Sequence, residues 1–124
     1  MTRVLVVDDN TRNRKLARDV LDAAGFDTLE AATGVEALEL AAEHEPDVIL
    51  LDLRLPDMHG VEVVRQLREG ERTARIPVVA MSAISLREQS DWLETAGFAG
   101  SLDKPINVRA FPDQVRRFCT GSGG

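Results

Sequence analysis

Four short apolar runs in this chain lead into residues that carry a carboxylate, a hydroxyl or an ammonium group. The runs and the residues after them are 4–7 before Asp8 and Asp9, 48–51 before Asp52, 78–81 before Ser82, and a weaker run ending at 102 before Lys104. Runs of this length are typical of strands buried on both faces of a parallel sheet. Helical crossovers direct the C-terminal ends of parallel strands to one edge, where open α/β sheets bind ligands. These polar side chains are therefore expected to meet at that edge.

Helical patterns separate the runs, and a further strand-like segment over residues 26–31 is short and half polar. Three of the predicted helices cover about residues 11–24, about 60–68 and 107–119. The second helix is opened by Thr33 and Glu36 and runs through Val35, Leu38 and Ala42. The fourth helix is opened by Ser85 and Glu88 and ends at Gly97. The two opening pairs are capping boxes, which satisfy free N–H groups at a helix start. Gly25 is expected to end the first helix. The apolar residues expected on one face of that helix are Leu16, Val20, Leu21 and Ala24.

Prolines limit several of these elements. Pro46 separates the second helix from the next strand, and Pro77 marks the start of the strand after it. Pro112 lies within the last helical pattern and cannot donate a hydrogen bond to the carbonyl four residues earlier. That helix therefore either begins nearer Phe111 than Asn107 or is bent.

Five strands that alternate with five helices predict an α/β fold, in which right-handed crossovers cover both faces of a parallel sheet. Two doubly wound strand orders are compatible with this pattern. The flavodoxin-like order 2-1-3-4-5 puts the half-polar strand at an edge and sets Asp8 and Asp9 beside Asp52. Because that order brings the carboxylates together, we expect a flavodoxin-like, doubly wound, five-stranded parallel sheet with five helices.

Composition and charge narrow the class of protein. The chain has 124 residues, 44% of them apolar and 29% charged, which fits one globular domain over residues 1–119 with a flexible tail at 120–124. The net charge of −6 argues against direct nucleic-acid binding. No apolar stretch has the length of a membrane span or a signal peptide. The single cysteine, Cys119, cannot form an internal disulfide, so a cytoplasmic location is expected.

The three carboxylates at the predicted sheet edge require a counter-charge, because clustered acids repel one another. A carboxylate-rich site without a nearby cysteine or histidine pair favours Mg²⁺ over zinc. The alternative is that Asp8 and Asp9 only cap the first helix, where negative charge is favourable. Asp52 on the neighbouring strand, together with Lys104, favours the cation site.

Four segments, in this order and covering essentially the whole chain, carry a family resemblance. They are VLVVDDN at 4–10, DVILLDLRLPDMHG at 47–60, IPVVAMSA at 76–83 and GFAGSLDKPI at 97–106. With them the chain resembles the response-regulator receiver domains of bacterial two-component signalling. The resemblance implies that Asp52 is the phosphoacceptor, which takes a phosphoryl group from the phosphohistidine of a sensor histidine kinase or a phosphotransfer protein.

The same resemblance implies the other site roles. Asp9 is implied to coordinate Mg²⁺ directly, Asp8 to coordinate it mainly through water, and the Arg54 backbone carbonyl to supply a further oxygen ligand. Ser82 is implied to donate a hydrogen bond to the phosphoryl group, and Lys104 to form an ion pair with it. A carboxylate nucleophile forms an acyl phosphate, and such a site works mainly by positioning groups and neutralising charge. The output partner is not implied.

The chain departs from the family pattern near the site. Ser101 stands where receivers commonly carry a switch tyrosine or phenylalanine, three positions before Lys104. Arg54 and Ile84, two positions after Asp52 and Ser82, are bulky and could crowd the access of water to the phosphoryl group. We therefore expect a long phosphoryl lifetime and a weak change of the partner-binding surface.

Two other classes of function remain as alternatives. Aspartate-nucleophile phosphohydrolases usually carry a second aspartate two residues after the nucleophile, where this chain has Arg54. A pseudo-receiver, which binds partners without taking phosphate, would not need the complete set of acids, hydroxyl and lysine. The sequence thus favours a phosphoacceptor switch, which transfers phosphate only to itself and slowly hydrolyses it, over an enzyme with external substrates.

Overall fold

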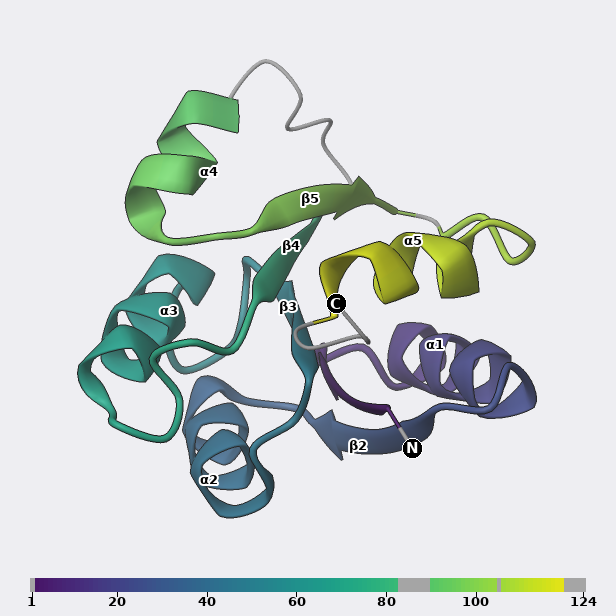
Figure 1. The fold of residues 1–124 in the computed structure, drawn as a ribbon, viewed down its shortest axis with the longest axis horizontal. Coiled ribbons are helices and arrows are strands. Elements are labelled where there is room, and N and C mark those ends of the chain that lie inside the picture. Colours follow the sequence, from purple (N-terminus) through teal and green to yellow (C-terminus); the bar gives the residue numbers. More distant parts are fainter. Residues whose placement is uncertain (1, 83–89, 105, 120–124) are drawn as a thin grey trace.

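The computed structural model describes residues 2–82, 90–104 and 106–119, without the side chains of residues 82 and 90–92. The predicted capping box of Ser85 and Glu88 lies outside the described residues. Strands and helices alternate along the chain (Figure 1). The strands are β1 (Arg3–Val7), β2 (Asp27–Ala31), β3 (Val48–Asp52), β4 (Val78–Ser82) and β5 (Gly100–Asp103). The helices are α1 (Thr11–Ala23), α2 (Gly34–His44), α3 (Gly60–Glu69), α4 (Ser90–Ala96) and α5 (Phe111–Phe118).

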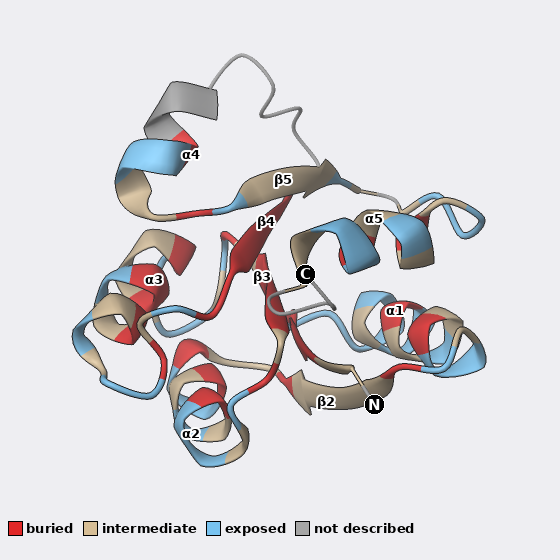
Figure 2. Ribbon diagram, viewed as in Figure 1, coloured by how far each residue is buried: buried red, intermediate tan, exposed pale blue. Residues whose placement is uncertain are grey.

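The five strands form one parallel sheet in the order β2-β1-β3-β4-β5, which confirms the predicted flavodoxin-like arrangement. The register aligns Val7 with Leu51 and Asp52 with Met81, so β1, β3 and β4 end close to one another. The half-polar β2 lies at an edge, as expected. Every β3 residue before Asp52 is buried, because helices cover both faces there (Figure 2).

Alternate residues of the central strands β1, β3 and β4 enter two separate cores. One face of the sheet carries α1 and α5, and the other carries α2, α3 and α4 (Figure 1). The core under α1 and α5 includes Val4, Val6, Leu21, Leu50, Val79, Phe111 and Val115. The core under the other helices includes Leu5, Val7, Ala37, Ala41, Ile49, Leu51, Val64 and Leu67. Both cores support the central strands whose ends carry the acidic residues.

The helix ends follow the local signals in the sequence. The Thr33 hydroxyl accepts a hydrogen bond from the Glu36 N–H, which confirms the predicted cap of α2. Gly25 follows α1 with a φ of 93° and Gly97 follows α4 with a φ of 102°, a left-handed conformation that glycine adopts without strain.

The last helix begins at Phe111 and not at Asn107, which confirms the first of the two alternatives predicted from Pro112. Pro112 lies in the first turn, where no intrahelical N–H bond is lost. The Asn107 side chain accepts hydrogen bonds from the N–H groups of Arg109 and Ala110 and so forms a separate turn before the helix.

The predicted inner face of the first helix is partly wrong. Ala17 and Leu21 pack on the sheet, whereas Leu16 is 43% exposed. In α2, Ala37 and Ala41 are buried and Val35 is 49% exposed. Ala42 is also exposed, while Leu38 packs at the margin of the core. Small alanine side chains let a helix lie close to the sheet, and this turns the larger residues toward the flanks.

Among the described residues, none of the helices has the length and apolar character to cross a membrane.

Candidate metal and phosphoryl site

Three carboxylates meet at the C-terminal edge of the sheet. Asp8 and Asp9 follow β1, and Asp52 is the last residue of β3. One oxygen from each carboxylate lies within 4.8 Å of the other two, a spacing that one metal ion can span. Asp8 is buried, Asp52 is partly buried and Asp9 is exposed. All-oxygen ligands with an open side fit Mg²⁺, which retains water when it binds proteins.

Lys104 reaches the same cluster from the residue after β5. Its Nζ donates a hydrogen bond to Asp8 Oδ2 at 2.9 Å and lies 3.3 Å from Asp52 Oδ2. Burial alone would lower the pKa of Lys104, but the hydrogen bond and charge of Asp8, and then those of Asp52, outweigh it and raise the pKa above its ordinary value. Lys104 is therefore a stable cation in contact with the carboxylates of Asp8 and Asp52.

The other oxygens of these two acids hold the loops that follow them. Asp8 Oδ1 accepts a hydrogen bond from the Asn10 N–H at 2.9 Å, and Asp52 Oδ1 accepts one from the Arg54 N–H at 3.1 Å. Each is a local side-chain-to-backbone turn of the kind that aspartate favours. The chain thus turns sharply after both acids, and each Oδ2 is directed to Lys104.

The loop after Asp52 is held in place by close backbone packing. The Gly60 N–H donates to the Leu53 carbonyl at 2.8 Å, and a Cβ at position 60 would lie 3.0 Å from Leu53 Cα. Further along the loop, Asp57 accepts hydrogen bonds from the N–H groups of Gly34 and Val35, at 2.8 and 3.0 Å. These backbone hydrogen bonds, first Gly34 and then Val35, hold the pKa of Asp57 below its ordinary value.

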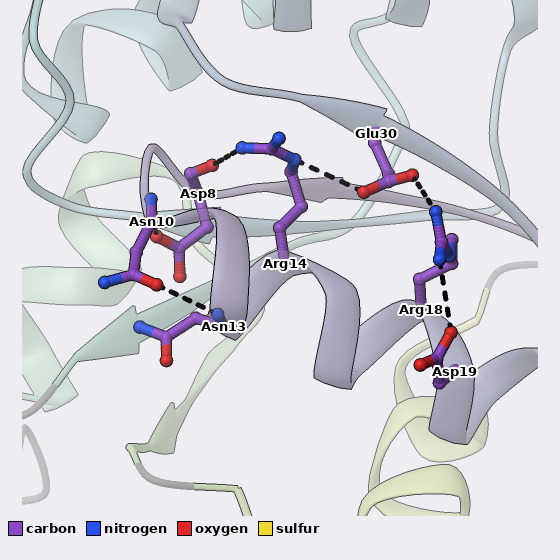
Figure 3. A network of polar contacts seen from close by, with 7 residues as sticks. All are labelled: Asp8, Asn10, Asn13, Arg14, Arg18, Asp19 and Glu30. Atoms are coloured by element: carbon purple, nitrogen blue, oxygen red, sulfur yellow. Dashed lines mark hydrogen bonds and ion pairs between the residues drawn. The ribbon is translucent and has the colours of Figure 1, made fainter.

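Two contacts close to the site were missed by the sequence analysis. Asp57 caps α2 from a loop 23 residues away, which no local pattern indicates. Arg14, in α1, donates through Nη1 to the Asp8 backbone carbonyl at 2.8 Å (Figure 3). The available signal was Glu30, an acid next to the end of the edge strand, since a partly buried charged side chain there needs a partner such as Arg14.

The structure brings Asp8, Asp9, Asp52 and Lys104 together, as the sequence predicted. Ser82 ends β4 at the same edge, but its side chain lies outside the described part, as does Ile84. Ser101 is half-buried in β5 and pairs with Ala80. Arg54 is exposed beside Asp52. The roles expected for Ser82, Ile84 and Ser101 stay predictions. So do the two roles of Arg54, metal coordination by its backbone carbonyl and shielding of the phosphoryl group by its side chain.

The match to a known family spans nearly the whole chain. Residues 4–116 match the model of the response regulator receiver domain. The chain is 37% identical to the polar-differentiation response regulator DivK of Brucella ovis over 115 residues, which cover 93% of this chain and 94% of that protein.

Solved structures agree with this match. The chemotaxis response regulator CheY4 of Vibrio cholerae has a TM-score of 0.88 and 30% identity, with 95% of this chain and 98% of that one covered. The receiver domain of the sensor histidine kinase PA1611 of Pseudomonas aeruginosa, solved with magnesium coordinated in its active-site cleft, has a TM-score of 0.85 and 28% identity over 99% of this chain and 98% of that one. The sheet order, the acidic cluster at its edge and these matches together show that the chain belongs to the response regulator receiver domain family.

Proposed function

We propose that the protein is a phosphoacceptor switch, in which Asp52 takes a phosphoryl group from the phosphohistidine of a sensor histidine kinase or a phosphotransfer protein. The observation that carries this proposal is the Asp52 carboxylate, which has an oxygen within 4.8 Å of Asp8 and Asp9 and lies 3.3 Å from Lys104 Nζ. Family membership supports the same role. A cytoplasmic location and an output by contact with a partner protein belong to this proposal.

The transfer needs a nucleophile and charge neutralisation. An Asp52 oxygen attacks phosphorus, the bond from phosphorus to the donor's imidazole nitrogen breaks, and its electron pair stays on that nitrogen. The product is an acyl phosphate on Asp52. A bound Mg²⁺, held by Asp8, Asp9, Asp52 and the Arg54 carbonyl, would neutralise charge on the phosphoryl oxygens.

Lys104 contributes a second positive charge. Its contacts to Asp8 and Asp52 keep a cation directly beside the acceptor oxygens. After transfer, Lys104 pairs with the new phosphoryl group and Ser82 donates a hydrogen bond to it. Both groups then respond to the presence of phosphate, as a switch requires.

Two features tune the output of this switch. Ser101 has no aromatic ring, so burial of a ring cannot contribute to the conformational change, and the surface formed by α4, β5 and α5 should change weakly. Arg54 and Ile84 slow the approach of water to phosphorus and lengthen the phosphoryl lifetime. The protein acts on itself and has no external substrate in this proposal.

Intact mass spectrometry with acetyl phosphate tests the proposed function. With Mg²⁺ present, the protein should gain one phosphoryl group, and EDTA should prevent the gain. Asp52→Asn, which keeps the size of the side chain, should gain none. The same stoichiometric adduct in Asp52→Asn would contradict the assignment, and the absence of any adduct in the wild type would favour the pseudo-receiver alternative.

A further inference from the structure

A chain of polar contacts connects the edge strand β2 to the backbone of the acidic site. Arg14 lies between the two (Figure 3). Its Nε donates to Glu30 Oε1 at 3.2 Å, and its Nη1 donates to the Asp8 carbonyl at 2.8 Å. The Arg14 side chain is only 18% exposed, so both contacts are partly shielded from water.

The Asp8 carbonyl lies where β1 leaves the sheet. The Asp8 N–H still donates to the Ala31 carbonyl at 3.1 Å, but β1 ends at Val7 and β2 at Ala31. The Asp8 carbonyl accepts a hydrogen bond from the Arg14 side chain. This side-chain donor replaces the backbone donor that a neighbouring strand would supply if the sheet continued. A buried backbone carbonyl without a donor is costly, which makes this contact a specific requirement of the turn.

The orientation of that carbonyl also determines where Asp9 lies. The carbonyl of Asp8 and the N–H of Asp9 belong to one planar peptide unit. Fixing the oxygen therefore fixes the plane from which the Asp9 side chain departs. Asp9 is exposed, so its position depends mainly on this backbone.

We infer that Arg14, held by Glu30, is a positioning residue for the acidic site: it sets the Asp8–Asp9 peptide so that both carboxylates are arranged for Mg²⁺ before the ion binds. This inference rests on the proposed function, because it concerns the same metal site. Partners that orient metal ligands from outside the first coordination shell typically contribute about 10–100-fold to metal affinity.

Arg18 provides a matched control. It donates to the other oxygen of Glu30 at 2.9 Å and to Asp19 at 3.3 Å, and no hydrogen bond joins it to Asp8. Arg14→Gln and Arg18→Gln therefore each remove one positive charge and one ion pair with Glu30. Only the first removes the donor to the Asp8 carbonyl.

The sign of the effect separates positioning from simple electrostatics. Loss of a positive charge near a cation site strengthens Mg²⁺ binding if only Coulomb repulsion matters. Loss of the positioning contact weakens it. Arg14→Gln should lower Mg²⁺ affinity about tenfold, whereas Arg18→Gln should leave it within about twofold. Arg14→Lys keeps the charge and one donor, so its affinity should lie between Arg14→Gln and the wild type.

Isothermal titration calorimetry with MgCl₂ measures these affinities, and NMR spectra of the Mg²⁺-free proteins give a second readout. The amide signals of Asp9 and Asn10 should shift in Arg14→Gln and not in Arg18→Gln. In a Glu30→Gln background, Arg14→Gln should cost less affinity than in the wild type, because Arg14 is then already less constrained.

Unchanged or tighter Mg²⁺ binding by Arg14→Gln would overturn the inference while leaving the proposed function intact. Equal weakening by Arg14→Gln and Arg18→Gln would also overturn it, since that result indicates a general loss of the ion-pair network. Failure of the wild type to bind Mg²⁺ would overturn both the inference and the metal site of the proposed function.

Discussion

Lys104 and Asp8 lie 96 positions apart in the sequence and are joined by a 2.9 Å hydrogen bond between Nζ and Oδ2. This contact connects the end of β5 to the end of β1 across the site, since Lys104 also lies 3.3 Å from Asp52. The lysine side chain is 16% exposed and that of Asp8 is 8% exposed. Lys104 thus places a positive charge in direct contact with two of the three clustered carboxylates.

Lys104→Met should make the stability of the protein depend strongly on Mg²⁺. In EDTA the variant should lose about 3 kcal/mol of unfolding free energy, because a shielded carboxylate pair is left without its cation. In excess Mg²⁺ the loss should be smaller, since ligand binding stabilises the folded state. Urea unfolding in both conditions measures this difference. An equal loss with and without Mg²⁺ would show that Lys104 does not balance the metal ligands.

Arg68 should be important for stability although it has no acidic partner among the described residues. Its guanidinium donates to the carbonyls of Ala74, Ile76 and Gly97 at 3.1, 2.8 and 2.8 Å, and so joins the segment before β4 to the end of α4. Burial lowers the pKa of Arg68 from its ordinary value. Arg68→Met should cost about 2–3 kcal/mol, because it leaves several carbonyls without donors.

Arg65 is the control for Arg68, since it lies on the same helix and its ion pairs with Glu62 and Glu69 are on the exposed face. Arg65→Met should change stability little, because surface ion pairs contribute weakly. Chemical unfolding of the two variants compares them directly. A larger loss for Arg65→Met than for Arg68→Met would contradict the role given to the carbonyl contacts.

Gly60→Ala should disturb Asp52, the proposed phosphoacceptor, through the backbone. The new Cβ would lie 3.0 Å from Leu53 Cα and 3.3 Å from the Asp52 carbonyl oxygen, so the strand end must move. We expect a stability loss of about 1–3 kcal/mol and slower phosphorylation by acetyl phosphate. Gly25→Ala is the control, since its positive φ creates strain but nothing lies within 4 Å of the added Cβ. Wild-type phosphorylation kinetics in Gly60→Ala would refute this prediction.

The contribution of Asp57 to the free energy of unfolding should decrease at acidic pH. Hydrogen bonds from the Gly34 and Val35 N–H groups lower its pKa below the ordinary value of 3.8 in the folded protein. A lowered folded-state pKa means that the stabilisation is complete above the ordinary pKa and is lost as the pH falls through the folded-state pKa. The stability difference between wild type and Asp57→Asn should therefore be largest near neutral pH and shrink below about pH 4. Urea unfolding across this range measures it, and a difference that grows with acid would contradict it.

The sequence was sufficient to predict the sheet order and the acidic cluster, because both follow from strand-end residues and from the rules that govern parallel sheets. The start of α5 was also predictable, since Pro112 acts through its own missing N–H. The orientations of α1 and α2 were not. Leu16 and Val35 carry larger apolar side chains than Ala17 and Ala37, yet the alanines face the sheet because a helix packs more closely on small residues.

Contacts between distant segments were the other part that sequence patterns could not supply. Asp57 reads as an ordinary turn residue, and its role depends on where the start of α2 lies in space. Arg14 reads as a solvated charge on an exposed helix. Glu30 in the edge strand indicates that Arg14 has a partner, but the hydrogen bond from Arg14 to the Asp8 carbonyl follows only from the structure.

Mapping of the phosphorylated residue distinguishes Asp52 from the neighbouring acids. The acyl phosphate formed with acetyl phosphate and Mg²⁺ can be reduced by borohydride, which converts the phosphorylated aspartate to homoserine. Trypsin then separates the candidates, because Asp8 and Asp9 fall in the peptide 4–12 and Asp52 falls in the peptide 19–54. Phosphorylation of Asp52 should give homoserine at position 52 alone. Homoserine at position 8 or 9, with Asp52 unmodified, would contradict it.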